Sequence, residues 1–301
     1  MTVKVILNPY AGRWLALERK EQLESTLKEA KIDYELVVTN GPGHGIDLAK
    51  QAVEQGFNPV IAAGGDGTYS EVINGIVAAN NNDGSVEFGV IPLGSANDLA
   101  ENLNLPKEIP AAVGVIVGGY TRKMDLCQVN DRYFGNNAAI GLEPYITLIQ
   151  QRIKRLKGSF RYLTATLLGV KDKPRWDMSL EWEGGSYEGP VTLVTVGNSP
   201  RTGGIFYMTP HADPFDGLLT FVYGFMPTRR RILSLLPRTM KPGEGSYVEH
   251  PQIHEVNTPW LKVSSIQPTP AHADGEVFAE QIHDLSYRVF PGCLPILMQE
   301  N

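Results

Sequence analysis

Val60-Ile61-Ala62-Ala63-Gly64-Gly65-Asp66-Gly67-Thr68 is the stretch that decides the fold. Its four apolar residues predict a short buried strand, and Glu71-Val72-Ile73 begins a helical pattern soon afterwards. Glycines let a backbone approach a phosphate closely, and the amides of a helix start point donors toward it. Asp66 adds a carboxylate suited to Mg²⁺, and we expect it to be exposed at the strand end. A tight turn capped by Asp66 or Thr68 would have the same sequence, so this stretch alone leaves both interpretations open.

A second strand and glycine turn repeat this chemistry. Phe88-Gly89-Val90-Ile91 predicts another buried strand, which leads into Pro92-Leu93-Gly94-Ser95-Ala96-Asn97-Asp98-Leu99-Ala100. Ligands of open α/β sheets bind at the carboxyl ends of strands. Two such ends, each with an aspartate, predict a site for one polyphosphate and its Mg²⁺. Asp98 equally suits the first turn of a helix, where the helix dipole favours a carboxylate.

These blocks resemble the two signature blocks of the diacylglycerol kinase catalytic family, which includes bacterial diacylglycerol kinases, sphingosine kinases and ceramide kinases. Three further segments resemble that family and follow in its order. They are Asn8-Pro9-Tyr10-Ala11-Gly12, Gly203-Gly204 with Asp213-Pro214-Phe215-Asp216-Gly217-Leu218-Leu219, and Asp274-Gly275-Glu276. The matches run from residue 8 to residue 276, and five motifs in order are far more specific than one.

Composition agrees with a soluble globular protein of two domains. The chain has 301 residues, of which 42% are hydrophobic and 20% charged. A net charge of −6 argues against broad nucleic-acid binding, which requires a basic surface. No apolar run approaches the roughly 18 residues of a membrane span, and the start of the chain is typical of a strand, not of a signal peptide. Two cysteines, Cys127 and Cys293, fit a reducing cytoplasm.

The first part of the chain alternates strands and helices, which predicts an α/β domain with a doubly wound parallel sheet. The expected strands are Val3–Leu7, Tyr34–Thr39, Val60–Ala63 and Phe88–Pro92. The first two expected helices cover about residues 15–31 and Asp47–Gln55. A third ends at Ala79, a fourth ends at about Leu103, and a fifth covers about Pro110 to Val117. The resemblance implies a phosphofructokinase-like or NAD kinase-like nucleotide-binding domain over residues 1–123, to which about residues 288–301 return.

The alternation of strands and helices ends after Lys123. Short strand-like runs separated by Gly, Pro and Asp follow, and they predict an antiparallel β-sandwich. The expected strands are Met124–Val129, Tyr133–Asn137, Met178–Trp182, Pro190–Gly197, Leu218–Tyr223, Leu261–Ile266 and Leu285–Phe290. Helical pieces are expected near residues 146–170 and 228–238. The resemblance implies that this part, residues 124–287, is a lipid-acceptor domain.

Phosphoryl transfer depends mainly on positioning and charge neutralisation, so glycines and polar groups at strand ends are the candidates for binding ATP. The predicted nucleotide-binding residues are Asn8, Gly12, Thr39, Gly64, Gly65, Asp66, Gly67, Thr68, Glu71 and Ser95. Ser95 stands where the family usually has Thr, and the hydroxyl is kept.

The predicted catalytic residues are Asp66, Asp98, Asp274 and Glu276. Asp66 and Asp98, with Glu276, are candidates to organise Mg²⁺, partly through water. Asp274 is the candidate general base toward the acceptor hydroxyl, a role that the resemblance supports. Alternate residues of an extended segment share a face, so we expect Asp274 and Glu276 to reach one centre together.

A second metal position is implied by the resemblance. There Asp213, Asp216 and the backbone of Leu218 would hold a structural Mg²⁺. An Asp-rich turn closed by Gly217 forms readily without metal, so the spacing itself leaves both interpretations open.

Two basic amphipathic segments suggest contact with an anionic bilayer. Ile146, Ile149, Ile153 and Leu156 recur at helical spacing among Arg152, Lys154, Arg155 and Lys157, and Arg229-Arg230-Arg231 precedes a second apolar stripe. Either segment could instead bury its apolar face in its own domain. We expect a lipid substrate at the membrane surface, a cytoplasmic protein peripheral to the inner face of the membrane, no nucleic-acid partner, and a homodimer as one option.

The leading hypothesis is an ATP- and Mg-dependent lipid kinase whose acceptor is diacylglycerol or a related lipid alcohol. An NAD kinase-like enzyme shares the Gly64–Thr68 loop but would need a different second block. A catalytically silent lipid- or nucleotide-binding regulator would tend to lose the carboxylates Asp66, Asp98, Asp274 and Glu276, which this chain retains. No motif distinguishes diacylglycerol from ceramide, sphingosine, undecaprenol or a sterol-like alcohol.

Overall fold

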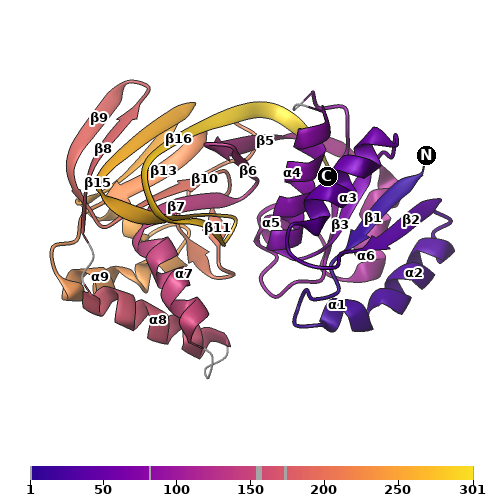
Figure 1. Cartoon of the computed structure of the whole chain (residues 1–301), viewed down its shortest axis with the longest axis horizontal. Helices are drawn as coiled ribbons and strands as arrows, with labels where there is room; N and C mark the ends of the chain where they lie inside the picture. The colour runs from indigo at the N-terminus through magenta and orange to yellow at the C-terminus, as the bar shows by residue number, and fades with distance from the viewer. Residues whose placement is uncertain (1, 81–82, 154–157, 173–174, 301) are drawn as a thin grey trace. The chain divides into compact units, whose positions relative to one another are not determined.

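The computed structural model describes residues 2–80, 83–153, 158–172 and 175–300 (Figure 1). The chain divides into two compact units. The first unit comprises Met1–Leu126, Tyr133–Gly135 and Phe290–Asn301, and the second comprises Cys127–Arg132 and Asn136–Val289. The chain therefore leaves the first unit and returns to it with its last residues.

The first unit is built on a parallel sheet. Its strands are β1 (Val3–Leu7), β2 (Tyr34–Val38), β3 (Val60–Gly64) and β4 (Phe88–Pro92), in the spatial order β4-β3-β1-β2. The end of β16 (Glu276–Leu297) adds a parallel partner, because Ile296 lies opposite Phe88. The predicted α/β architecture is confirmed. Since β1 pairs with both β2 and β3, the strand order reverses between β1 and β3, which is where open α/β sheets bind ligands.

Six helices follow these strands in the described part of the first unit. They are α1 (Leu15–Glu18), α2 (Lys20–Glu29), α3 (His44–Glu54), α4 (Asp66–Asn80), α5 (Asp98–Asn102) and α6 (Ile109–Gly118). The prediction of one helix over residues 15–31 is wrong, because Arg19 adopts φ −89° and ψ 0°, which ends α1 before α2 begins. Helix α4 packs on α3 and on β3, so the start of α4 is held at the carboxyl edge of the sheet.

The second unit is dominated by antiparallel strands, as the sequence predicts for a β-sandwich. A continuous row has the order β14-β13-β10-β7-β15-β16, and β8 joins β15 to β9. The strands are β7 (Asn137–Gly141), β8 (Trp176–Trp182), β9 (Gly185–Val191), β10 (Leu193–Gly197), β13 (Leu219–Gly224), β14 (Ile253–Thr258) and β15 (Trp260–Ala273). Shorter strands are β6 (Arg132–Phe134), β11 (Arg201–Thr202) and β12 (Phe206–Tyr207), and β5 (Thr121–Val129) pairs with β16 and β6.

Two of the predicted strands are each split in two. The expected strand Tyr133–Asn137 is interrupted at Gly135 and Asn136, because the backbone N–H of Asn136 donates to the Asp274 side chain instead of a neighbouring strand. The expected strand Pro190–Gly197 is interrupted at Thr192, whose N–H donates to the Gly224 carbonyl while its own carbonyl accepts from Leu142.

The described helices of the second unit are α7 (Leu142–Arg152), α8 (Gly158–Asp172) and α9 (Arg229–Leu235), followed by the single turns η1 (Arg238–Met240) and η2 (Tyr247–Glu249). Among these helices, α7 packs on the sheet and α8 packs on α7. Ile146 is buried in a cluster with Leu142 and Ala165, and Ile149 and Ile153 pack against it. The apolar stripe of α7 is therefore used inside its own unit, and Leu156 with its neighbours Lys154, Arg155 and Lys157 lies outside the described residues.

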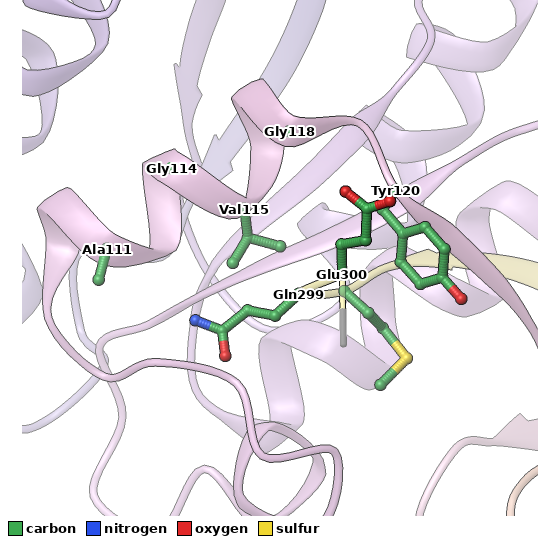
Figure 2. A pocket seen from close by; sticks show the side chains of 8 residues that line it. Ala111, Gly114, Val115, Gly118, Tyr120, Gln299 and Glu300 are labelled. Atoms are coloured by element: carbon green, nitrogen blue, oxygen red, sulfur yellow. The ribbon is translucent and has the colours of Figure 1, made fainter.

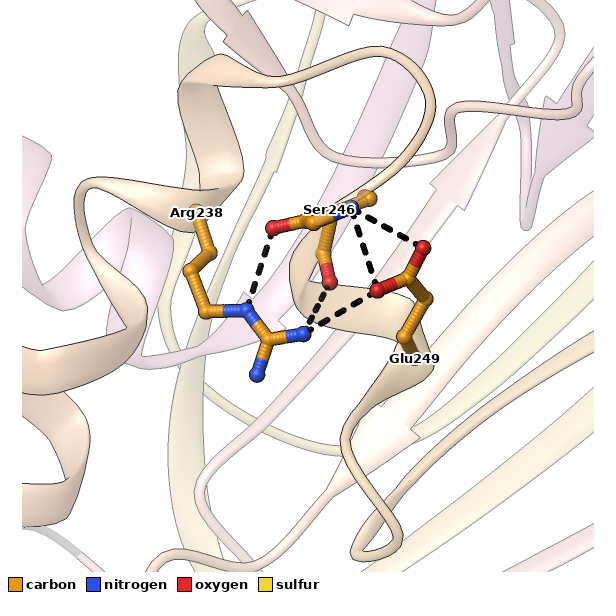
Figure 3. Close-up of polar contacts among 4 residues, drawn as sticks. Arg238, Ser246 and Glu249 are labelled. Atoms are coloured by element: carbon orange, nitrogen blue, oxygen red, sulfur yellow. Dashed lines mark hydrogen bonds and ion pairs between the residues drawn. The ribbon is translucent and has the colours of Figure 1, made fainter.

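The Arg238 side chain forms hydrogen bonds that stabilise the fold of this region. Arg238 donates from Nε to the Gly245 carbonyl (3.1 Å) and from Nη2 to the Ser246 carbonyl (2.7 Å), while the Glu249 carboxylate accepts from the Gly245 N–H (3.0 Å) (Figure 3). These bonds close the segment between η1 and η2. Arg229, Arg230 and Arg231 differ from Arg238 in being exposed on α9.

Candidate functional site

The loops that follow β1, β3 and β4 meet at the carboxyl edge of the first unit's sheet. A Cβ on Gly94 would lie 2.5 Å from the Cα of Gly65, so the two glycine turns touch backbone to backbone. The Leu93 N–H donates to the Gly64 carbonyl at 2.7 Å. Gly12 has φ +60°, and a Cβ there would lie 2.7 Å from the Leu93 carbonyl oxygen. Only glycine fits these approaches, which explains why the sequence places glycines in three separate segments.

Asn8 and Thr68 connect the two strands that flank the reversal of strand order. Asn8 follows β1, and its Nδ2 donates to Oγ1 of Thr68 in the first turn of α4 at 3.0 Å. Thr68 is buried, and the Asn8 Oδ1 accepts from the Tyr10 N–H at 3.0 Å. The predicted residues Asn8, Gly12, Gly64, Gly65 and Thr68 are therefore brought together by the fold.

Two residues that the sequence analysis did not single out organise this junction. Asn97 accepts from the Gly94 N–H (2.9 Å) and donates to the Gly94 carbonyl (3.1 Å). The Tyr69 hydroxyl lies 3.0 Å from the Gly64 carbonyl oxygen and 3.3 Å from Asn97 Oδ1. Burial, and secondarily the Asp66 charge, raises the pKa of Tyr69 well above its usual value, so the hydroxyl stays protonated. Asn97 has φ +53°, a conformation that asparagine tolerates better than most residues. The signal in the sequence was therefore the asparagine itself, which stands three residues after Gly94.

Asp66 is half-buried, so the expectation of an exposed carboxylate is wrong. Its Oδ1 accepts from the Leu99 N–H at 3.2 Å, which places the carboxylate against the start of α5. Burial raises the pKa of Asp66, while hydrogen bonds from backbone amides, that of Leu99 foremost, oppose the rise. Asp98 is buried in the first turn of α5, where the helix dipole would stabilise a carboxylate.

The remaining predicted nucleotide-binding residues have different surroundings. The Glu71 carboxylate accepts from the N–H groups of Gly43 (2.7 Å) and Gly45 (2.8 Å), so it fixes the loop at the start of α3. Thr39 follows β2 and is 4% exposed, and within the described part of the chain its hydroxyl has no hydrogen-bond partner. Gly67 lies in the first turn of α4, and Ser95 is exposed in the turn after β4.

The Asp274-Gly275 pair forms the tip of a β-hairpin. Ala273 at the end of β15 lies opposite Glu276 at the start of β16, and both turn residues have positive φ, +46° and +80°. The expectation of an extended segment that presents Asp274 and Glu276 on one face is therefore wrong, because an Asp-Gly pair favours a two-residue hairpin turn. Asp274 Oδ1 accepts from the N–H groups of Asn136 (3.0 Å) and Asn137 (3.1 Å), while Glu276 is exposed.

The side chains of Asp213 and Asp216 each accept a hydrogen bond from the backbone N–H two residues later in the chain. Asp213 Oδ1 accepts from the Phe215 N–H (3.0 Å), and Asp216 Oδ1 accepts from the Leu218 N–H (2.9 Å). These are turns of the kind that aspartate forms without metal. Across the described ranges, no three or more His, Cys, Asp or Glu side chains cluster in a way that could hold a metal ion.

A surface pocket of about 560 Å³ lies away from these residues, still within the first unit. It is lined by Ala111, Gly114, Val115, Gly118 and Tyr120 of α6 and the chain beyond it, and by Met298, Gln299 and Glu300 (Figure 2). None of the predicted site residues lines it. Among the described residues, no helix has the length and apolar character needed to cross a membrane.

Comparison with known proteins identifies both parts of the chain. Residues 2–129 match the diacylglycerol kinase catalytic domain, and residues 136–298 match the YegS C-terminal NAD kinase beta sandwich-like domain. Together these matches account for most of the chain, and they follow the order in which the sequence motifs occur.

Full-length relatives support the same grouping. The chain is 28% identical over 275 residues to the diacylglycerol kinase of Staphylococcus saprophyticus subsp. saprophyticus, covering 91% of this chain and 88% of the relative. It is equally similar to the diacylglycerol kinase of Staphylococcus carnosus, at 28% identity with the same coverage. The crystal structure of a diacylglycerol kinase from Bacillus anthracis str. Sterne has the same fold, with a TM-score of 0.79, 20% identity, and coverage of 99% of this chain and 97% of that one.

Proposed function

Because the chain belongs to the diacylglycerol kinase family of lipid kinases, we propose that it transfers the γ-phosphate of ATP to the hydroxyl of diacylglycerol or a closely related lipid alcohol. The observation that carries this proposal is the junction of the Gly12, Gly65 and Gly94 turns. It lies at the carboxyl ends of β1, β3 and β4, beside the reversal of strand order between β1 and β3, and the start of α4 adds backbone donors there.

The residues at this junction fit a nucleotide. The buried Thr39 hydroxyl lacks a partner among the described residues, and a ribose or phosphate oxygen would supply one. Asn8 and Thr68 hold the first turn of α4 in place, so its amides are fixed before ATP arrives. Preorganised donors stabilise the charge of a phosphoryl group without a reorganisation cost at the moment of reaction.

Carboxylates of both units have distinct proposed roles. Asp66 and Asp98 of the first unit would hold Mg²⁺ partly through water, and the bound ion would neutralise phosphate charge. The role expected for Glu276 of the second unit stays a prediction. Asp274 would accept the proton of the lipid hydroxyl as the bond to phosphorus forms. The second metal position at Asp213, Asp216 and the Leu218 backbone stays a prediction.

The experiment that tests the proposal is a kinase assay with labelled ATP, Mg²⁺ and diacylglycerol in mixed micelles, followed by mass analysis of the product. Asp274→Asn should lower the turnover rate by about 10²–10⁴-fold and leave ATP affinity nearly unchanged, because a general base acts only as the proton departs. Asp131→Asn is the matched control, since Asp131 is an exposed aspartate of the two-residue turn between β5 and β6. Wild-type turnover in the Asp274→Asn enzyme would exclude Asp274 as the base.

NAD is a second acceptor to include in the assay, because the second unit matches a domain described as NAD kinase beta sandwich-like. Phosphorylation of NAD without phosphorylation of lipid would replace the lipid proposal. If no acceptor is phosphorylated while ATP still binds, the silent-regulator alternative would be favoured.

We place the membrane contact of this enzyme on α8 and α9. Leu167 and Leu168 of α8 and Leu233 of α9 are 49%, 43% and 37% exposed, and α9 also carries the exposed residues Arg229, Arg230 and Arg231. Exposed apolar side chains beside arginines suit the surface of an anionic bilayer, such as the inner face of a cytoplasmic membrane.

Replacing the three arginines by glutamine should weaken sedimentation with vesicles that contain phosphatidylglycerol. Sedimentation with neutral phosphatidylcholine vesicles should change little. Equal binding of the wild-type and substituted proteins to the anionic vesicles would remove α9 from the contact.

A further inference from the structure

Two adjacent asparagines join two segments of the second unit that are far apart in sequence. The Asn136 and Asn137 N–H groups both donate to Oδ1 of Asp274, and the Asn137 carbonyl accepts from the Asp274 N–H at 2.7 Å. Asn136 Nδ2 also donates to the Arg201 carbonyl at 3.1 Å. The start of β7 therefore links the hairpin tip at Asp274 to the segment that precedes Gly203-Gly204.

The Asn137 side chain extends this network in two directions. Its Oδ1 accepts from the Thr202 hydroxyl at 3.0 Å, and its Nδ2 donates to Oε1 of Glu143 at 3.3 Å. Asn137 is 2% exposed, so these contacts are shielded from water. Hydrogen bonds at a buried position are costly to break, because the group left behind has no solvent to replace its partner.

Glu143 in turn pairs with a buried histidine. Glu143 Oε1 lies 3.2 Å from Nε2 of His272, which is 2% exposed and stands two residues before Asp274 on β15. Within the described part of the chain, neither Glu143 Oε2 nor His272 Nδ1 has a hydrogen-bond partner. Fold stability alone does not favour an ionisable pair whose buried Glu143 Oε2 and His272 Nδ1 lack hydrogen-bond partners, because apolar residues of similar size would pack there at lower cost.

We propose that Asn137 is a positioning residue for Asp274, and that Glu143, paired with the buried His272, holds Asn137 in the orientation this requires. The inference rests on the proposed function, because it assigns Asp274 the role of base. Both N–H donors reach the same oxygen, so the backbone at Asn136 and Asn137 fixes the position of Oδ1 of Asp274. Glu143 and Thr202 fix the side chain of Asn137, and β7 cannot tilt at its first residue while both bonds hold.

The test combines Glu143→Ala and Asn137→Ala with Asp274→Asn in double-mutant cycles. In the wild-type background each alanine variant should lower kcat by about 10- to 100-fold with little change in KM for ATP, because a misplaced base affects the chemical step. In the Asp274→Asn background the same variants should cause no more than about a twofold further loss, since residues that act as a unit are strongly non-additive. Glu143→Gln keeps an acceptor for Asn137 Nδ2 and should recover most of the rate lost in Glu143→Ala.

Glu255→Ala is the matched control, because Glu255 forms the other described Glu–His pair of this unit, with 2.6 Å between its Oε2 and Nδ1 of His211. It should retain kcat within about twofold, and melting temperatures of all variants report whether the unit is folded. Losses of kcat that multiply fully in the Asp274→Asn background would show that Glu143 and Asn137 do not act through Asp274. Wild-type turnover of the Asp274→Asn single variant would instead overturn the base assignment itself, so the two failures are distinguishable.

Discussion

Replacing Gly94 by alanine tests whether the contact between the two glycine turns is required for phosphoryl transfer. The added Cβ would lie 2.5 Å from the Gly65 Cα and 2.6 Å from Asn97 Oδ1. Carbon atoms in contact are normally separated by about 3.5–4.0 Å, so the two turns must move apart by about 1 Å. No positive φ is recorded at Gly94, so the expected effect is steric and not a strain of the backbone conformation.

The size of the effect follows from that displacement. Overpacking of a buried contact typically costs about 1–3 kcal/mol, which for a protein of this size lowers the melting temperature by about 3–10 °C. A shift of about 1 Å at a catalytic constellation can lower the rate by about 10²-fold. We therefore expect Gly94→Ala to remain folded at 25 °C and to lose about two orders of magnitude in kcat/KM for ATP.

The assay measures phosphorylation of diacylglycerol at several ATP concentrations, together with thermal unfolding. Gly114→Ala is the control, because Gly114 lies in α6 of the same unit and a Cβ there meets no atom within 4 Å. Glycine within a helix costs roughly 0.5–1 kcal/mol relative to alanine, so this control should be slightly more stable and fully active. If Gly94→Ala has the melting temperature and kcat/KM of the wild-type enzyme, the contact between the turns has no role in nucleotide binding.

Asp66→Asn should abolish turnover without lowering the melting temperature at pH 7, because asparagine keeps an acceptor for the Leu99 N–H and removes a charge that burial disfavours. Burial raises the pKa of Asp66, so the stability that this carboxyl group contributes is fully present below the unfolded pKa of 3.8 and is lost as pH rises through the folded pKa. Unfolding measured over a pH series should show this loss in the wild-type protein and not in Asp66→Asn. Glu71→Ala should cost about 1–3 kcal/mol of stability, because two backbone amides lose their acceptor, and should change KM for ATP only slightly. A raised KM with an unchanged melting temperature would favour the nucleotide-binding role first predicted for Glu71.

The sheet of the first unit could be predicted because its signals are local. The runs Val60–Ala63 and Phe88–Ile91 are short and mainly apolar and lead into glycine turns, and each becomes a buried strand. The contacts that assemble the candidate site are not local. Glu71 bonds amides 26 and 28 residues earlier in the chain, and no helical periodicity reveals which loop lies beside it.

The hairpin at Asp274 was readable from the sequence in principle. An Asp-Gly pair between strand-like residues is a strong signal for a two-residue turn, and the observed φ values of +46° and +80° fit one. The extended interpretation neglected that signal. In contrast, the contacts of Asn137 with Glu143 and of Glu143 with His272 depend on β7 pairing with β15, which only the folded sheet reveals.

The capping and catalytic interpretations of Asp66 lead to opposite expectations for stability. A capping carboxylate stabilises a helix start in its ionised form, so its pKa falls on folding. Asp66 does accept a hydrogen bond from the start of α5, yet burial dominates and its pKa rises. Burial therefore disfavours the ionised form of Asp66 in the folded chain, although asparagine would make the same hydrogen bond without that cost. Perturbed carboxylates of this kind concentrate at functional sites, and the position of Asp66 after β3 is where a phosphate-bound cation would need a negative charge. A higher melting temperature for Asp66→Asn together with lost turnover would establish that the charge serves the reaction, whereas a lower melting temperature would assign it to the helix start.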